Sequence, residues 1–195
     1  MKDLPTQAPS PLAHAPTWRQ LALGSAGIGV WVLFNAVIVH LVWQDPRGDS
    51  VLGAYADGAL GWWKGKDIFG SGPDGFLYLP SFAVLFTPFA KLGAPLGDAA
   101  WRVLSAGLLA YGIWRFLRLL LPDASWRWMA TALGVALLLT VPGGGAALRD
   151  GQASTMLMAL CLLAAAEIAA GRSWPAAALL ALALAVKPLA FVLLL

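Results

Sequence analysis

Long runs of apolar residues alternate with short polar segments along this chain. The first run covers residues 18–43, about 26 positions with a tryptophan at each end. Because about 20 apolar residues suffice for a helix to cross the roughly 30 Å hydrocarbon core of a bilayer, this run predicts a transmembrane helix. The later apolar segments are 81–96, 101–121, 126–141, 153–170 and 174–195. The pattern predicts an all-α, polytopic transmembrane helical bundle without an intervening soluble domain.

Composition supports a membrane environment. Hydrophobic residues make up 59% of the chain and charged residues 12%, with a mean hydropathy of +0.73, whereas soluble domains have about 25% charged residues. Most of the surface must therefore face membrane lipids. The 13 basic residues are scattered and form no stripe that could follow a phosphate backbone, which excludes nucleic acid as a partner. The single cysteine, Cys161, excludes an intrachain disulfide and a cysteine-based metal cluster.

The N-terminal residues 1–17 differ from the rest of the chain. They are rich in Pro, Ala and polar side chains, and they lack the basic and apolar regions of a cleavable signal peptide. We expect a disordered cytoplasmic tail here, followed by one transmembrane domain over residues 18–195.

Residues 44–80 form the one long polar loop, which holds five of the ten acidic residues. Inside it, apolar residues recur at helical spacing and predict a short interfacial helix over residues 50–64. Trp62 and Trp63 would anchor this helix at the level of the lipid headgroups, because an indole ring has one apolar and one polar edge.

Segment 81–96 decides the topology. It has about 16 residues and contains two prolines, which makes it a poor span. We interpret it as re-entrant or interfacial. This places the later basic residues on the side of Arg19, as the positive-inside rule prefers; they are Arg115, Arg118, Arg127 and Arg172. The loop 44–98, the segment 143–152 and Lys187 are then all expected at the outer face.

Three aspartates, Asp45, Asp49 and Asp57, lie near the end of the first predicted helix. A carboxylate at the membrane surface can accept a proton from a hydroxyl group and so act as a general base. Asp49 also precedes the predicted interfacial helix, where an aspartate commonly caps the first turn, and Asp57 fits a solvated helix face. General base and helix cap are therefore both open interpretations of Asp49.

A second polar group follows the glycine run 143–145 and consists of Arg149, Asp150, Gly151 and Gln152. We expect a turn and the start of a helix here. A helix N-terminus beside an arginine attracts anions, and a glutamine can donate a hydrogen bond to a sugar or phosphate oxygen. The alternative is a flexible turn in which the aspartate caps the helix and the arginine extends toward the membrane surface.

Lys187 lies deep in the last apolar segment. A lysine at such a depth costs roughly 2.5–3.5 kcal/mol on insertion scales unless it meets an anion or a water-filled cavity. Pro188 follows it and is expected to bend the helix. This pair therefore indicates a functional position.

Taken in order, these motifs resemble glycosyltransferase family 87, over roughly residues 31–195. The matching residues are Asp49 with Tyr55, Gly65, the segment 76–80, Gly151 with Gln152, and Lys187 with Pro188. Two positions depart from the family pattern. Leu79 stands where the family has the first proline of Tyr-Pro-Pro, and Ala153 stands where it has an asparagine.

The resemblance implies a GT-C-like fold and an inverting hexosyltransferase of a bacterial inner (plasma) membrane. Its expected partners are a polyprenyl-phosphate-linked sugar donor, with mannose as one candidate sugar, and a lipid or glycan acceptor. Asp49 would be the catalytic base. The implied substrate-binding residues are Tyr55, Tyr78, Arg149, Asp150, Gln152 and Lys187.

No cofactor is indicated, and a divalent metal is not required because the cationic side chains can stabilise a leaving phosphate. The family is longer than this chain, which ends within an apolar segment, so we expect a C-terminal truncation. Two alternatives stay open. One is a lipid or solute transporter, although no internal repeat is found, and the other is a non-catalytic membrane fragment.

Overall fold

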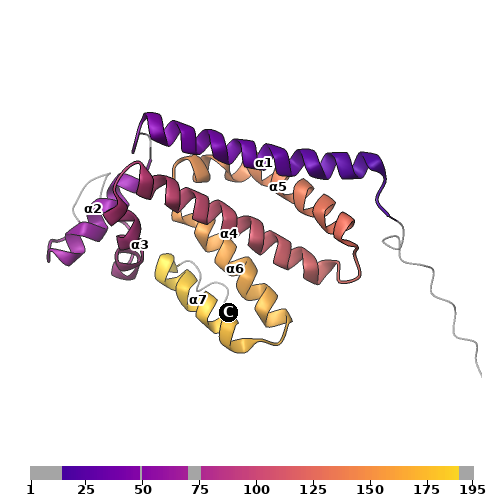
Figure 1. Ribbon diagram of the computed structural model, residues 1–195. Coiled ribbons are helices and arrows are strands. Elements are labelled where there is room, and N and C mark those ends of the chain that lie inside the picture. Colours follow the sequence, from indigo (N-terminus) through magenta and orange to yellow (C-terminus); the bar gives the residue numbers. More distant parts are fainter. Residues whose placement is uncertain (1–14, 49, 70–75, 189–195) are drawn as a thin grey trace, which may run out of the picture.

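The computed structural model describes residues 15–48, 50–69 and 76–188, and these form seven helices and no strand (Figure 1). The helices are α1 (Trp18–Gln44), α2 (Leu52–Trp63), α3 (Pro80–Leu92), α4 (Leu96–Leu120), α5 (Trp126–Arg149), α6 (Ala153–Ala169) and α7 (Ser173–Val186). The predicted all-α fold is confirmed. Most of the predicted tail, residues 1–14, lies outside the described residues.

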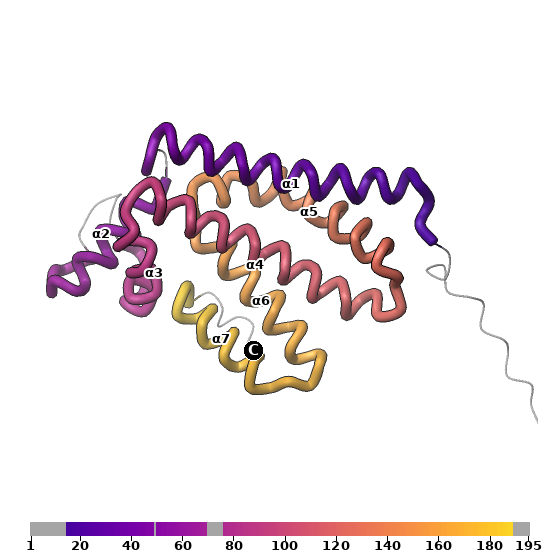
Figure 2. Tube along the Cα trace, viewed as in Figure 1, coloured from indigo at the N-terminus to yellow at the C-terminus, as the bar shows by residue number. Residues whose placement is uncertain are grey.

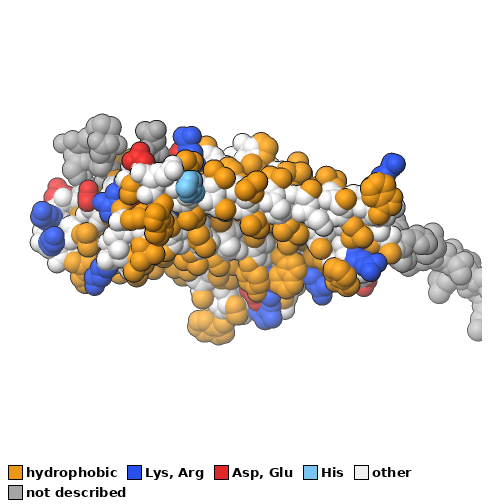
Figure 3. All heavy atoms as spheres, turned by 45° about the horizontal axis from the view of Figure 1, so that its top comes forward, with side chains coloured by type: hydrophobic (Ala, Val, Ile, Leu, Met, Phe, Trp, Pro, Cys, Tyr) orange, Lys and Arg blue, Asp and Glu red, His pale blue; other side chains and the backbone are white. Residues whose placement is uncertain are grey.

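Three helices are long and apolar enough to cross a membrane: α1, α4 and α5, with 27, 25 and 24 residues. At about 1.5 Å per residue, each is roughly 36–40 Å long. Within their most apolar stretches only 22–28% of the residues are buried inside the protein. In Figure 3, apolar side chains cover most of the visible face along the long helices, and charged side chains lie mainly toward its ends. The predicted transmembrane bundle is confirmed.

Glycines allow α1 and α5 to pack closely. A Cβ atom on Gly27 would collide with the backbone carbonyl of Gly134, and one on Gly134 would collide with that of Gly24. Small residues at such a contact let two helix backbones approach and gain van der Waals contact, which is how helices associate in lipid. On the other side of α4 lies the antiparallel pair α6 and α7 (Figure 2).

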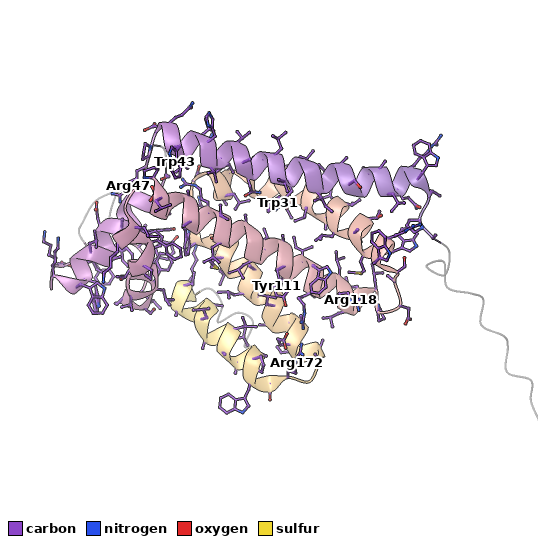
Figure 4. The ribbon with its side chains drawn as sticks, viewed as in Figure 1. Trp31, Trp43, Arg47, Tyr111, Arg118 and Arg172 are labelled. Atoms are coloured by element: carbon purple, nitrogen blue, oxygen red, sulfur yellow. The ribbon has the colours of Figure 1, made fainter. Side chains whose placement is uncertain are left out.

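The short helices α2 and α3 pack against each other at one end of the long helices (Figure 1). Helix α1 ends and helix α4 begins at this same end. The segment that contains α2 and α3 therefore does not run the length of the long helices. The opposite end carries basic residues: Arg115 Nη2 lies 2.6 Å from Glu167 Oε1, and Arg172 Nε lies 2.5 Å from Glu167 Oε2. Arg118 and Arg172 both lie away from Arg47 in Figure 4.

Two helix boundaries differ from the predictions. The glycine run 143–145 is part of α5, which continues past Pro142 to Arg149. A proline removes only one helix hydrogen bond, and long apolar helices in membranes tolerate both proline and glycine. The predicted turn therefore shortens to residues 150–152. The interfacial helix predicted over 50–64 is confirmed as a helix over the residues of α2.

Candidate functional site

A hydrogen-bond network joins α2, the segment before α3 and the start of α6. The hydroxyl of Tyr55 donates to the hydroxyl of Tyr78 at 2.6 Å and accepts from the backbone amide of Ala153 at 3.3 Å. Tyr55 is only 2% exposed, and its ring makes edge contacts with Phe82 and Phe86. Burial, followed by the bond to Tyr78, raises the pKa of Tyr55 above its usual value. Its hydroxyl therefore stays protonated and keeps its one hydrogen-bond donor on Tyr78.

Lys187 belongs to the same region. Its Nζ donates to Ser154 Oγ at 3.2 Å and lies 5.8 Å from the centre of the Tyr78 ring. The prediction that Pro188 bends a helix is wrong, because α7 ends at Val186 and the backbone of Lys187 is already extended. A residue that precedes proline is disfavoured in the helical conformation, so the helix ends before Lys187 instead of bending.

A cavity of about 540 Å³ lies beside the two tyrosines, and we call it the tyrosine cavity. Its size falls within the range of about 300–1,000 Å³ that is usual for small-ligand sites. Its polar lining residues are Ser50, Tyr55, Asp57, Tyr78 and Gln152, and Phe76 forms part of its wall. Among the described residues that line it, none is a lysine or an arginine.

A second cavity of about 280 Å³ lies between the end of α1 and the end of α5, and we call it the arginine cavity. Arg102 and Arg149 line it together with Gln44, Asp45, Ser50 and three apolar residues of α1. Arg102 is 4% exposed and donates through Nε and Nη2 to the backbone carbonyl of Arg149, at 3.0 and 2.8 Å. Ser50 lines both cavities and thus marks the point where they adjoin.

The turn between α5 and α6 is held from both sides. Trp101 Nε1 donates to the carbonyl of Gly151 at 2.9 Å, and the amide of Val51 donates to the carbonyl of Asp150 at 3.1 Å. Gly151 has φ +72°, and a Cβ atom there would lie 2.6 Å from Leu52 Cγ. Glycine satisfies both the backbone conformation and the close approach of α2. The turn thus lies between Arg149, which lines the arginine cavity, and Gln152, which lines the tyrosine cavity.

The predicted site residues are distributed over both cavities. Tyr55, Tyr78 and Gln152 line the tyrosine cavity, and Lys187 lies against the Tyr78 ring. Arg149 lines the arginine cavity instead. Asp150 lines neither cavity: its carbonyl accepts a hydrogen bond from the Val51 amide, and its carboxylate lies 3.4 Å from Arg149 Nε.

Asp49 lies outside the described residues. Its chain neighbours Gly48 and Ser50 both line the arginine cavity, and Ser50 also lines the tyrosine cavity. The other two candidate carboxylates lie at different cavities: Asp45 lines the arginine cavity, and Asp57 lines the tyrosine cavity.

Sequence reasoning missed Asp98 and Arg102, which are 2% and 4% exposed and lie one turn apart on α4. Asp98 Oδ2 is 3.9 Å from Arg47 Nε. Charged residues within an apolar helix are costly and usually functional, and this signal was available in the sequence. No group of three or more His, Cys, Asp or Glu side chains that could hold a metal occurs in the part of the chain that is described.

Three helices that are long and apolar enough to cross a membrane, with two cavities at one end of them, define a polytopic helical membrane protein. Residues 76–195 match the model of glycosyltransferase family 87, and the chain belongs to this family. It is therefore a membrane glycosyltransferase in general terms. No curated protein and no solved structure matches it. The match includes Tyr78, Arg149 and Lys187, whereas Asp49 and Tyr55 precede it.

Proposed function

We propose that this protein transfers a sugar, with mannose as the first candidate, from a polyprenyl-phosphate donor to a lipid or glycan acceptor. Beyond the family match, the tyrosine cavity carries this proposal. The Tyr78 hydroxyl, the Gln152 amide and the Asp57 carboxylate offer donors and acceptors to sugar hydroxyls, and aromatic rings offer an apolar wall to a sugar ring. A neutral, hydroxyl-rich ligand suits a cavity whose described lining residues include no basic side chain.

The proposed location is the outer face of a bacterial inner membrane, with the N-terminal residues in the cytoplasm. The basic residues at the end of the bundle away from the cavities support this orientation, because positive charge favours the cytoplasmic side. Trp62 and Trp63 are exposed on α2, which suits a helix at the lipid headgroups. A lipid-borne donor and a lipid acceptor would both reach a cavity at this depth.

Asp49 is the proposed general base. It would remove the proton from the acceptor hydroxyl, whose oxygen attacks the anomeric carbon as the bond from that carbon to the phosphate oxygen breaks. The anomeric configuration inverts, and polyprenyl phosphate leaves with the bonding electron pair. Arg149 and Lys187 would supply positive charge for this leaving group. The support for this role is that Gly48 and Ser50, on either side of Asp49 in the chain, line the cavities.

The test is transfer of a labelled sugar. Membrane vesicles that contain the protein would receive polyprenyl-phosphate mannose with a radiolabelled sugar, and lipid-extracted and glycan products would be counted. We expect label in a product with the inverted anomeric linkage, and little transfer by the Gln152→Ala variant. The same comparison would be made with other polyprenyl-phosphate hexoses. The proposal would be rejected if, for every sugar, vesicles with and without the protein incorporated equal amounts of label into products.

A further inference from the structure

Helix α3 has two apolar faces, and only one of them packs against the rest of the protein. The packed face consists of residues at helical spacing, Phe82, Ala83, Phe86, Thr87 and Ala90, all of them buried. The opposite face is exposed and consists of Val84, Leu85, Pro88, Lys91 and Leu92, of which four are apolar. With 13 residues, α3 is about 20 Å long, too short to cross a hydrocarbon core. Its exposed apolar face therefore lies at one end of the spanning helices without a partner among the described residues.

The last turn of α2 continues this exposed face. Trp63 Nε1 donates to Thr87 Oγ1 at 2.8 Å, which holds the end of α2 beside the second half of α3. Trp62 and Trp63 are 41% and 62% exposed. Exposed indole rings at the end of a membrane-spanning helix are typical of the headgroup level. We call residues 62–66 together with the exposed face of α3 the α2–α3 surface.

Three lysines lie on the α2–α3 surface, and all three are exposed. Lys64 follows Trp63, and Lys91 lies one turn after Thr87, on the apolar face of α3. The amide of Lys66 donates to the carbonyl of Gly61 at 3.1 Å, so the chain turns back beside the end of α2. Within the described part of the chain, no hydrogen bond or ion pair involves the ammonium group of any of the three. Figure 3 shows basic side chains next to apolar ones at the end that carries α2 and α3.

The described carboxylates do not neutralise these lysines. Asp67 is exposed and is the one described carboxylate next to them in the chain. Asp57 precedes Lys64 by seven residues, roughly 10 Å along a helix, and lines the tyrosine cavity. Asp98, at the start of α4, is buried and lies 3.9 Å from Arg47 Nε. The α2–α3 surface therefore combines apolar side chains, indoles and an excess of positive charge.

We infer that the α2–α3 surface binds membrane lipids that carry an anionic headgroup. Its apolar side chains enter the boundary of the acyl chains, and the lysines extend their ammonium groups to the lipid phosphates. A soluble anion would leave the apolar face of α3 in water, and a neutral apolar partner would leave the three charges unmatched. A net negative headgroup satisfies both. This inference rests on the surface and on the three membrane-spanning helices, and it is independent of the proposed sugar transfer.

Lipid quenching tests this inference. The full chain, with Cys161→Ala and a fluorophore on Leu92→Cys, would be purified in a neutral maltoside detergent. It would be titrated with phosphatidylglycerol and with phosphatidylcholine that carry the same brominated acyl chains. The neutralised variant is Lys64→Gln with Lys66→Gln and Lys91→Gln, and a second variant has arginine at the same three positions. The control is Arg118→Gln, which removes an exposed charge at the other end of α4.

We expect the unaltered lysines to give about a tenfold preference for phosphatidylglycerol at low salt, because each lysine near an anionic surface contributes up to about fivefold. The preference should disappear in the neutralised variant and persist in the arginine variant and in the control. High salt should reduce it. Exposed lysines are replaced with little effect on folding, and Lys91→Gln alone should already lower the preference severalfold.

Two results would overturn the inference. One is equal quenching by the two lipids with the lysines intact, or an equal preference with and without them. The other is no quenching by either lipid, which would show that the exposed face of α3 is covered by something other than lipid, such as a second copy of the chain. Because the titration contains no sugar donor, neither result bears on the proposed function.

Discussion

The hydroxyl of Tyr55 lies 2.6 Å from the hydroxyl of Tyr78, across 23 positions of sequence. This bond connects α2 to the segment before α3, and the same Tyr55 oxygen accepts the amide of Ala153 at the start of α6. One buried side chain thus holds three segments around the tyrosine cavity. A change in this contact should alter both stability and substrate binding.

Tyr55→Phe should lower the free energy of unfolding by about 1–3 kcal/mol, because the Ala153 amide and the Tyr78 hydroxyl lose a partner in a buried position. Thermal unfolding in detergent, followed by tryptophan fluorescence, measures the effect. The control is Tyr111→Phe, which alters an exposed tyrosine on α4. Equal unfolding temperatures for the two variants would mean that the network contributes nothing.

The raised pKa of Tyr55 predicts a loss of stability at alkaline pH. Below about pH 10 the tyrosine is protonated in both folded and unfolded chains, so stability does not depend on it. Above that pH the unfolded chain releases the proton and the folded protein keeps it, so stability falls as pH rises. The decline above pH 10 should be shallower for Tyr55→Phe. Parallel profiles for the two proteins would show that burial does not shift this titration.

Asp49→Asn should reduce turnover by about 10² to 10⁴, the usual cost of losing a general base. Asparagine is nearly the same size as aspartate, and the N-cap of α2 is Val51, so insertion and stability should hardly change. Initial rates of sugar transfer at saturating donor measure the effect, with Asp45→Asn and Asp57→Asn as milder comparisons. Near-full activity of Asp49→Asn with loss in Asp57→Asn would move the base to the carboxylate in the tyrosine cavity.

Gly151→Ala should destabilise the protein more than Gly171→Ala. Both glycines have a positive φ, +72° and +71°, so both substitutions cost about 1–2 kcal/mol of backbone strain. Only the Cβ at position 151 meets a neighbour, Leu52, and this overlap should add about 1–3 kcal/mol. The difference between the two unfolding temperatures isolates the packing contribution. A larger loss in Gly171→Ala would contradict the close contact of α2 with the turn.

Labelling with an impermeant thiol reagent tests the sides of the membrane. In a Cys161→Ala background, Lys66→Cys and Arg149→Cys should both react from outside intact cells. Both positions lie at the end of the long helices where α2, α3 and the two cavities are found. Asp123→Cys, between α4 and α5, should not react. A reaction at only one of the first two positions would show that the segment between α1 and α4 crosses the membrane.

Much of the architecture followed from local sequence. Apolar runs near the length of a bilayer span determined α1, α4 and α5, because lipid leaves backbone groups no partner outside a helix. Helical spacing in the polar loop predicted α2. The predicted end near Val141 was wrong for α5, since a glycine run and a proline are turn signals in water and are tolerated in a long apolar helix.

The sequence by itself determined which residues carry polar chemistry, but only the tertiary structure decided which of them share a cavity. Arg149 and Gln152 are three positions apart in the chain, yet the turn at Gly151 places them on different cavities. Arg102 lines the arginine cavity only because α4 packs beside the end of α5. Hydropathy depends on each segment alone, whereas a cavity depends on how side chains from several helices pack, and no single segment encodes that.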